Sequence, residues 1–444
     1  MKVFIFIWFG QLISLIGSAL TSFALGVRVY QNTGSVTQFA LITLCATLPL
    51  VVVSPIAGTL VDRWSRRWTM ILSDFGSGMC TLAIAVLVAT DTLQIWHIYL
   101  ITALNSLFST FQWPAYTAAT TLLVPKEQLN RASGMVQSGE GVAQILSPAI
   151  AGVLLGTIGL GGIIFLDLAT CIFALLTLLC VRFPELETTT KEISIKALWE
   201  ELVYGFTYIT TRPGLVGILI FFAIINLFTG LITVLFPPLI LELFSPVVLG
   251  TVESISGIGI LTGSLLMIIW EGPTHRINTV FGIAIFMAVS IMAVGLHSSI
   301  FFLSVGGFFF LCGSPVIRAC LQVIWQTKVA PEVQGRVFAL RRMVARACLP
   351  LAALLAGPLD DYVFEPLMTT DGPLASSVGQ IIGVGAGRGI DLLFVFLGLL
   401  MILTTFLAYL YPPLRLVESQ LPDVPSSVEC SLDPSPIQPA APIL

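Results

Sequence analysis

A few ionisable side chains lie deep inside long apolar stretches of this sequence, where they are costly and therefore informative. Glu140 lies eight positions into the apolar stretch 132–156. It shares one helical face with Gln137 and Gln144. Burial disfavours the charged form of a carboxyl group, so at that depth Glu140 can take up and release a proton near neutral pH.

Arg318 lies at a depth comparable to that of Glu140, in a later apolar stretch. We expect the two to form an ion pair that holds one end of a passage shut until Glu140 is protonated. A pair that only fixes the packing is an equally good interpretation. Glu253, three positions before Ser256, is a second candidate for proton binding.

Two further acids, Asp74 and Asp167, lie within apolar stretches. An ionised side chain at such a depth must face protein or a water-filled cavity rather than lipid.

Four apolar stretches also carry polar residues at helical spacing, so that each set lies on one face of its helix. Lining of a water-accessible cavity is favoured over hydrogen bonding between helices, which Ser, Thr and Asn also provide. Together with the face of Glu140, these sets give the predicted substrate cavity. Its residues are Gln11, Ser14, Asn105, Gln112, Tyr116, Gln137, Gln144, Asn226, Thr229 and Gln322.

The composition predicts a protein that is surrounded by lipid. Of 444 residues, 56% are apolar and only 10% are charged, against about 25% charged residues in soluble proteins. The mean hydropathy is +0.98. A net charge of −4 argues against a nucleic-acid partner, which requires a basic surface.

The sequence lacks common motifs for catalysis and metal binding. No C-x-x-C pair occurs and the three histidines are far apart, so no metal or other cofactor is predicted. No Lys follows a Gly, which excludes a Walker A phosphate loop, and neither G-x-S-x-G nor H-E-x-x-H is present. We therefore expect that the chain is not an enzyme.

Apolar runs of about 20 residues are long enough to cross a bilayer as helices. With both termini in the cytoplasm, seventeen Lys and Arg lie on the cytoplasmic side, against Arg28 and Arg388 on the other. The sequence thus predicts an all-α membrane protein with twelve transmembrane helices in two six-helix pseudo-symmetric bundles. The predicted spans are 3–25, 37–59, 69–90, 95–123, 132–156, 160–182, 214–240, 248–270, 277–296, 299–325, 337–358 and 389–411.

Traces of duplication support two halves, because Val124–Arg131 resembles Val329–Arg336 after a shift of about 205 residues. The segment between the halves has apolar residues at helical spacing from Ile195 to Ile209, which predicts an amphipathic helix at the membrane surface. The predicted domains are a bundle at 1–182, a cytoplasmic linker at 183–213, a bundle at 214–412 and a disordered cytoplasmic tail at 413–444.

The loop after the second span resembles the G-x-L-x-D-R-x-G-R-R signature of the major facilitator superfamily, with Ser65 in place of a glycine. A second segment, from Ser147 through Pro148 to Gly152, is similar to the G-P-x-x-G-G motif associated with antiporters. The residues that match the first signature are Gly58, Leu60, Asp62, Arg63, Arg66 and Arg67.

Further segments resemble the macrolide-efflux-like drug exporters of that superfamily. The resemblance implies alternating access, export driven by proton exchange, and a central cavity lined by the first, fourth, seventh and tenth spans. It also implies that the spans of Asp74 and Asp167 lie at the periphery, which favours a structural role for both. These segments are Trp325–Val329, Gly335–Val337, Ala356–Asp360, Phe364–Pro366 and Gly385–Gly389.

The signature loop is expected to act as a latch. If spans two and eleven meet at the cytoplasmic face, Asp62 lies near the N-terminus of span eleven, where a helix dipole stabilises an anion by about 0.3–1 kcal/mol. Arg341 or Arg342 would add to this attraction, and the arginines of the loop would hold nearby acids or lipid phosphates. A loop that merely orients the protein explains its arginines but not the spacing of Asp62 and Arg63.

The predicted function is secondary active transport, as proton-coupled efflux of small amphipathic compounds. Uptake of a small polar metabolite by symport is the alternative. The expected partners are a small-molecule substrate, protons and the lipid bilayer, and the expected form is a monomer in the inner membrane of a bacterium.

Overall fold

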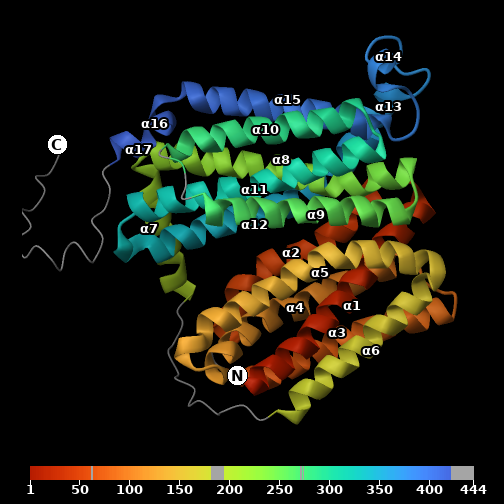
Figure 1. Ribbon diagram of the computed structural model, residues 1–444, viewed down its shortest axis with the longest axis vertical. Helices are drawn as coiled ribbons and strands as arrows, with labels where there is room; N and C mark the ends of the chain where they lie inside the picture. Colours follow the sequence, from red (N-terminus) through yellow and green to blue (C-terminus); the bar gives the residue numbers. More distant parts are fainter. Residues whose placement is uncertain (62–63, 182–194, 271–272, 274, 422–444) are drawn as a thin grey trace, which may run out of the picture.

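The computed structural model describes residues 1–61, 64–181, 195–270, 273 and 275–421, and every regular element in these ranges is helical (Figure 1). Twelve of the described helices exceed twenty residues, and each overlaps one predicted span. They are α1 (Lys2–Thr33), α2 (Val36–Val61), α3 (Arg66–Ala89), α4 (Ile95–Leu123), α5 (Leu129–Thr157), α6 (Gly159–Cys180), α8 (Pro213–Leu243), α9 (Pro246–Ile269), α10 (Arg276–Leu296), α11 (Ile300–Lys328), α12 (Pro331–Leu359) and α15 (Arg388–Leu410).

Shorter helices connect or extend these twelve. The π-helix η2 and the helix α13 continue directly from α12. The short elements are η1 (Lys126–Gln128), α7 (Ile195–Thr210), η2 (Asp360–Phe364), α13 (Glu365–Met368), α14 (Gly379–Ile382), α16 (Pro412–Arg415) and α17 (Val417–Gln420).

Eleven helices in the described ranges are long and apolar enough to cross a membrane. The remaining long helix is α4, whose Asn, Gln, Ser and Thr residues lower its mean hydropathy. Several of these polar residues are the ones predicted to face a cavity rather than lipid. The expectation of an all-helical membrane protein with twelve long helices is confirmed.

The long helices form two groups, which we call the first half (α1–α6) and the second half (α8–α12 and α15). Within the first half, α1 packs against α5 and α6, and α4 packs against α2 and α3. Within the second half, α11 packs against α9 and α10, and α15 packs against α8 and α10. Figure 1 shows the second half above the first, and the halves meet where α5 contacts α9 and α2 contacts α12.

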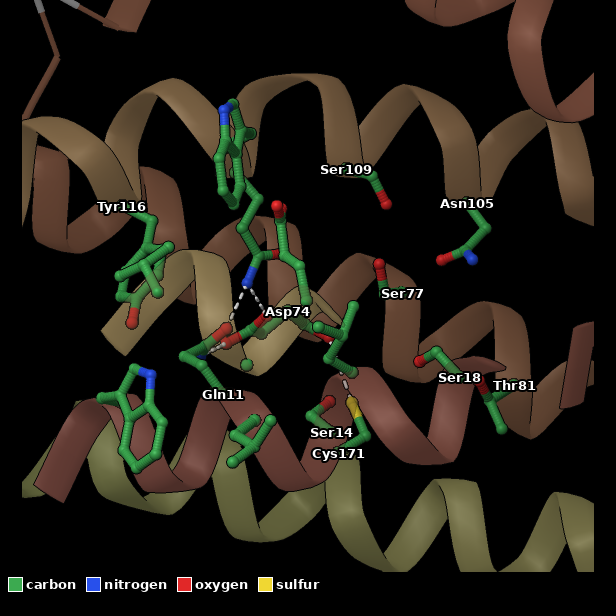
Figure 2. A pocket seen from close by; sticks show the side chains of 18 of the residues that line it. Gln11, Ser14, Ser18, Asp74, Ser77, Thr81, Asn105, Ser109, Tyr116 and Cys171 are labelled. Atoms are coloured by element: carbon green, nitrogen blue, oxygen red, sulfur yellow. Dashed lines mark hydrogen bonds between the residues drawn. The ribbon is translucent and has the colours of Figure 1, made fainter. Parts of the chain in front are cut away.

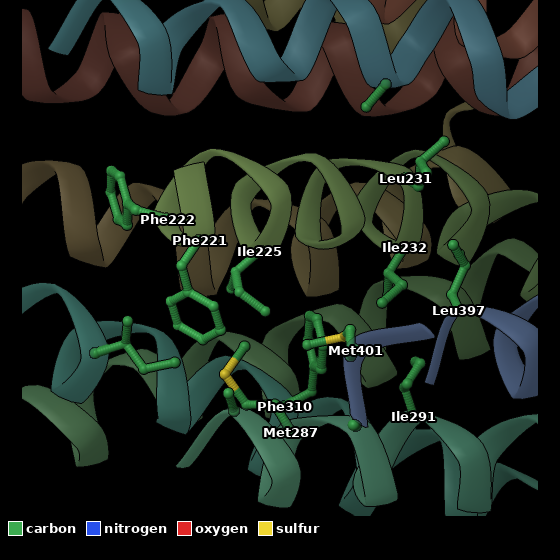
Figure 3. Packing of buried hydrophobic residues seen from close by; sticks show 14 of the residues in the cluster. Phe221, Phe222, Ile225, Leu231, Ile232, Met287, Ile291, Phe310, Leu397 and Met401 are labelled. Atoms are coloured by element: carbon green, nitrogen blue, oxygen red, sulfur yellow. The ribbon is translucent and has the colours of Figure 1, made fainter. Parts of the chain in front are cut away.

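The interiors of the two halves differ. A single large apolar cluster fills the second half, and Figure 3 shows Phe221, Met287, Phe310 and Met401 within it. The first half holds several smaller apolar clusters instead.

The structure describes parts of the predicted linker and tail. The predicted helix of the linker is present as α7, which packs against α12 and α8 and buries Ile209 in the second half. Its place at the membrane surface stays a prediction. The expected disorder from residue 413 is wrong as far as residue 421, because α16 and α17 bury Leu414 and Val417 in the same cluster. Residues 182–194 and 422–444, which include much of the predicted linker and tail, lie outside the described residues.

The antiporter-like segment of α5 forms the crossing with α9. Ser147 is buried there, and a Cβ atom on Gly152 would lie 2.7 Å from the carbonyl oxygen of Pro246. A Cβ atom on Gly250 of α9 would overlap the carbonyl oxygen of Pro148. The two helices therefore approach as closely as their backbones allow, as small residues permit in membranes.

At this crossing, a hydroxyl group from α9 forms hydrogen bonds with two backbone groups of α5. Ser254 Oγ donates to the carbonyl oxygen of Ile145 at 2.5 Å and accepts from the amide of Ala149 at 3.1 Å. Ile145 and Ala149 are an i, i+4 pair on α5. Pro148, between them, has no amide hydrogen to donate. An insertion of this kind marks a position at which a helix can bend.

The closeness of this crossing predicts a stability effect for Gly250→Ala. The added methyl group must push α5 and α9 apart, and such overpacking costs about 1–3 kcal/mol. Thermal unfolding of the protein in detergent, followed by tryptophan fluorescence, should show a lower transition temperature.

Gly282→Ala on α10 is the matched control, because a Cβ atom at Gly282 meets no described atom within 4 Å. This variant should unfold at or slightly above the wild-type temperature, since Ala favours a helix over Gly by about 1 kcal/mol. Equal transition temperatures for the two variants would show that the crossing is looser than described.

Candidate functional site

A cavity of about 350 Å³ lies inside the first half, with a wall built mainly from α1, α3, α4 and α5 (Figure 2). Two aromatic side chains, Trp8 and Trp113, contribute to the apolar part of this wall. Six residues predicted from the sequence lie in the wall, namely Gln11, Ser14, Asn105, Gln112, Tyr116 and Glu140.

Asp74 of α3 is buried in the wall of this cavity, with 4% of its surface exposed. Gln11 Nε2 donates to Asp74 Oδ2 at 2.8 Å. Gln112 Nε2 donates both to Asp74 Oδ1 and, at 2.8 Å, to Gln11 Oε1. Helices α1, α3 and α4 thus hold one carboxyl group through a closed network, and the dashed lines of Figure 2 converge on it.

The sequence favoured a structural role for Asp74, because its helix was expected at the periphery. Its position in the wall of the cavity, beside the predicted Gln11 and Gln112, was missed. A signal was present, since Asp74, Ser77 and Thr81 recur at i, i+3 and i+7 along α3, and all three line the cavity.

Asp167 of α6 lies behind the wall of this cavity and binds two side chains that belong to the wall. Ser18 of α1 donates to Oδ1 at 3.1 Å, and Thr81 of α3 donates to Oδ2 at 3.2 Å. These contacts fasten α6 to the helices beside it, which agrees with the structural role that the sequence favoured.

The wall of the cavity suits a particular kind of ligand. Its charged residues are Asp74 and Glu140, both acidic, while leucines and aromatic rings make up its apolar part. The hydroxyl group of Tyr116 is buried without a hydrogen-bond partner among the described residues. A buried hydroxyl group of this kind is normally satisfied by a ligand or by water.

Glu140 and Arg318 do not form the predicted ion pair in this structure. Both side chains are exposed, and the ion pairs between described residues do not join them. They belong to different halves, so their distance depends on how the halves are arranged. The pair therefore stays a prediction for an arrangement in which this end of the halves is closed.

Glu253 of α9 lies between the halves. One neighbouring cavity of about 220 Å³ is lined by residues of α5 and the second half, and another of about 400 Å³ is lined by α1, α2, α5, α8 and α9. Glu253, Pro148 and the predicted cavity residue Gln144 line both. Ser256 bonds back to the carbonyl oxygen of Val252 at 2.8 Å instead of to Glu253.

Four predicted cavity residues line none of these three cavities, so the structure does not bring them together with the others. Asn226 donates to the carbonyl oxygen of Phe222 on its own helix at 2.7 Å. Gln322 accepts from Arg341 Nη2 at 2.6 Å, within the second half. The other two are Thr229, which is half-buried, and Gln137, which is exposed.

The predicted latch is described only in part, because Asp62 and Arg63 lie outside the described residues. A Cβ atom on Gly58 would meet no described atom within 4 Å. Arg67 Nη2 donates to the carbonyl oxygen of Leu179 at 3.0 Å, near the C-terminus of α6, while Arg66 is half-buried. Arg67 binds a carbonyl oxygen here, and its expected contact with an acid or a lipid phosphate stays a prediction.

Comparisons with known proteins give one matching family model and several relatives. The model of the family described as Major Facilitator Superfamily matches residues 7–353. Macrolide efflux protein A of Streptococcus pyogenes is 28% identical over 361 residues, which cover 80% of this chain and 89% of that protein. Multidrug efflux pump Tap of Mycolicibacterium fortuitum is 25% identical over 369 residues, which cover 80% of this chain and 88% of that protein.

Solved structures share the fold at low sequence identity. A bacterial homolog of the human lysosomal transporter Spinster, in an inward-facing and unoccupied conformation, is 13% identical with a TM-score of 0.69, over 94% of this chain and 97% of that one. The nucleoside transporter NupG is 12% identical with a TM-score of 0.67, over 93% of this chain and 100% of that one.

The network around Asp74 predicts that Gln112→Leu destabilises the protein. The substitution removes the donor of Asp74 Oδ1 and of Gln11 Oε1, and a buried polar group left without its partner costs about 1–3 kcal/mol. Gln137→Leu, which changes an exposed side chain on α5, is the control. Thermal unfolding in detergent should separate the two variants, and an equal effect would contradict the network.

Proposed function

This chain belongs to the Major Facilitator Superfamily, and we propose that it exports amphipathic compounds, drugs among them, by proton-coupled alternating access. Membership makes it a multi-pass membrane transporter of small molecules rather than an enzyme. Export is supported by the relatives named macrolide efflux protein and multidrug efflux pump. The observation that carries the proposal is the cavity of the first half, which combines an apolar wall with two acidic side chains.

The charge of the cavity indicates which compounds are favoured. A buried carboxylate attracts a positive charge strongly, because little water screens the interaction. Asp74 is held by glutamine amides rather than by a cation, so its negative charge is free to balance one on a substrate. We therefore assign the cavity to compounds with an apolar body and a protonated amine or other cationic group.

Protons act in this proposal at acidic groups that lie between the halves or at the cavity. Glu140 lines the cavity, while Glu253 lines both cavities between the halves. Protonation of Glu140 would break its pairing with Arg318 when that end is closed. The predicted latch at Asp62 would strengthen the same closure.

The proposal also covers the orientation, the membrane and the oligomeric state of the protein. The excess of Lys and Arg on one side of the spans supports cytoplasmic termini, and the bacterial relatives support the inner membrane of a bacterium. A monomer suffices, because one chain contains the cavity and both halves. No cofactor enters the mechanism.

Transport by inside-out membrane vesicles tests the function. Vesicles that contain the protein should accumulate a cationic dye when their lumen is acidified, since release of protons from the lumen drives the dye inward. Glu140→Gln should abolish most of this proton-driven accumulation, whereas the exposed Glu127→Gln should leave it unchanged. Wild-type, proton-coupled rates for Glu140→Gln would overturn its role, and dye movement only in the opposite direction would indicate uptake.

The charge preference is tested separately through Asp74→Asn, which keeps the size of the side chain. Removing one member of a desolvated charge pair costs about 2–5 kcal/mol, so the apparent affinity for a quaternary ammonium dye should fall by at least about 30-fold. Affinity for a neutral dye of similar size should change little. An equal loss for both dyes would show that Asp74 only maintains the fold.

A further inference from the structure

Asp361, in the π-helical segment η2 that follows α12, binds the beginning of a helix in the other half. Its Oδ1 accepts from the amide of Val36 at 3.1 Å. Its Oδ2 accepts from the amide of Thr37 at 3.0 Å and from Ser35 Oγ at 2.7 Å. One carboxyl group of the second half thus receives three hydrogen bonds from the first.

These contacts complete the N-terminus of α2. The first amides of a helix have no partner within it and need one from outside. Ser35 Oγ accepts from the amide of Gln38 at 3.3 Å, which is a common type of cap. The two preceding amides, those of Val36 and Thr37, have Asp361 as their acceptor, so the cap of α2 is shared between the halves.

The surrounding contacts show that this end of the halves is closed. A Cβ atom on Gly357 would overlap Thr37, so α12 and α2 touch here. Tyr30 of α1 also donates to Glu242 of α8 at 2.8 Å, which joins the halves a second time.

The opposite end is more open. Glu140 and Arg318, which were predicted to pair there, are both exposed. A Cβ atom on Gly58, near the C-terminus of α2, would meet no described atom within 4 Å. The contacts of Asp361 therefore belong to the end at which the halves are held together in this arrangement.

Helices α2 and α12 run antiparallel. Thr37 lies beside Gly357, while Arg346 Nη1 donates to Ser54 Oγ at 3.2 Å farther along the pair. The C-terminal end of each helix therefore lies toward the N-terminal end of the other.

An aspartate lies just after each of these C-termini. Asp62 follows α2 directly, and Asp361 is the second residue after α12. Asp361 occupies at one end the position that Asp62 was predicted to occupy at the other, beside the N-terminus of the antiparallel partner.

We propose that Asp361 is the gating residue of the end opposite the signature loop, where it holds the halves together by capping α2 and releases that helix when this end opens. This rests on alternating access as proposed above. The charge of the carboxylate adds to its hydrogen bonds, because an anion at a helix N-terminus is stabilised by the helix dipole. When this end opens, water replaces Asp361 as the acceptor for the amides of Val36 and Thr37.

The test measures the separation of the halves directly, by pulsed electron-spin resonance on labels carried by noncanonical amino acids in the full chain. One label pair, at Thr157 and Ser245, reports the end at Asp361. A second pair, at Ser133 and Gln326, reports the opposite end. These four side chains are exposed. The readout needs no transport, so it can fail or succeed independently of the substrate and of proton coupling.

Asp361→Asn keeps the size of the side chain but removes its charge. The ratio of closed to open molecules at the Asp361 end should fall by about tenfold, because hydrogen bonds to a charged group are worth more than neutral ones. The opposite end should close in step. Asp361→Glu should restore part of the closed population, and Ser35→Ala, which removes one donor, should shift it less.

The control is Asp371→Asn, an exposed acid in the same connection between α12 and α15. It should leave both distance distributions unchanged. The proposal is overturned if Asp361→Asn lowers the unfolding temperature while both distributions stay as in the wild type, because Asp361 would then only stabilise α2. If Asp361→Asn fails to fold, the distance distributions of Ser35→Ala test the proposal instead. Distributions like those of the wild type in that variant also overturn the proposal.

Discussion

A polar group inside a membrane must find partners within the protein, because the hydrocarbon offers none. The arrangement of the first half follows from this constraint at Asp74. Its carboxyl group lies deep in α3, and amides of α1 and α4 converge on it because lipid cannot solvate a charge. The three helices are thereby held at fixed distances around a cavity, whereas a large apolar cluster occupies the interior of the second half.

The same constraint operates at the contacts between the halves. Where α5 crosses α9, Ser254 satisfies both a carbonyl oxygen and an amide of the opposite helix. Where α2 meets η2, Asp361 satisfies the first amides of α2. Both contacts join the two halves, so each polar group finds its partner in protein rather than in lipid.

Much of this arrangement could be predicted from the sequence, because helix length and polar spacing are local properties. The twelve spans were located from apolar runs. The helical spacing of the polar residues in the spans of Gln11 and Gln112 identified two helices that face the cavity. Asn226 shows the limit of such reasoning, since its side chain bonds to its own helix and periodicity cannot distinguish that from cavity lining. The position of Asp74 in the cavity wall was missed because the expected place of α3 in the bundle, rather than the spacing of its polar residues, guided the interpretation. Asp361 and Ser35 are 326 positions apart, so no local pattern indicates their contact.

The central claim is that the cavity beside Asp74 binds the cationic group of an exported compound. The most direct measurement is an experimental structure of the protein with a transported quaternary ammonium compound bound. The charged nitrogen should lie within about 6 Å of the Asp74 carboxylate, the range in which an opposite charge acts strongly, and the apolar body should lie against Trp8, Trp113 and Tyr116. A compound bound in the second half, or at Glu253 with the Asp74 cavity empty, would contradict it.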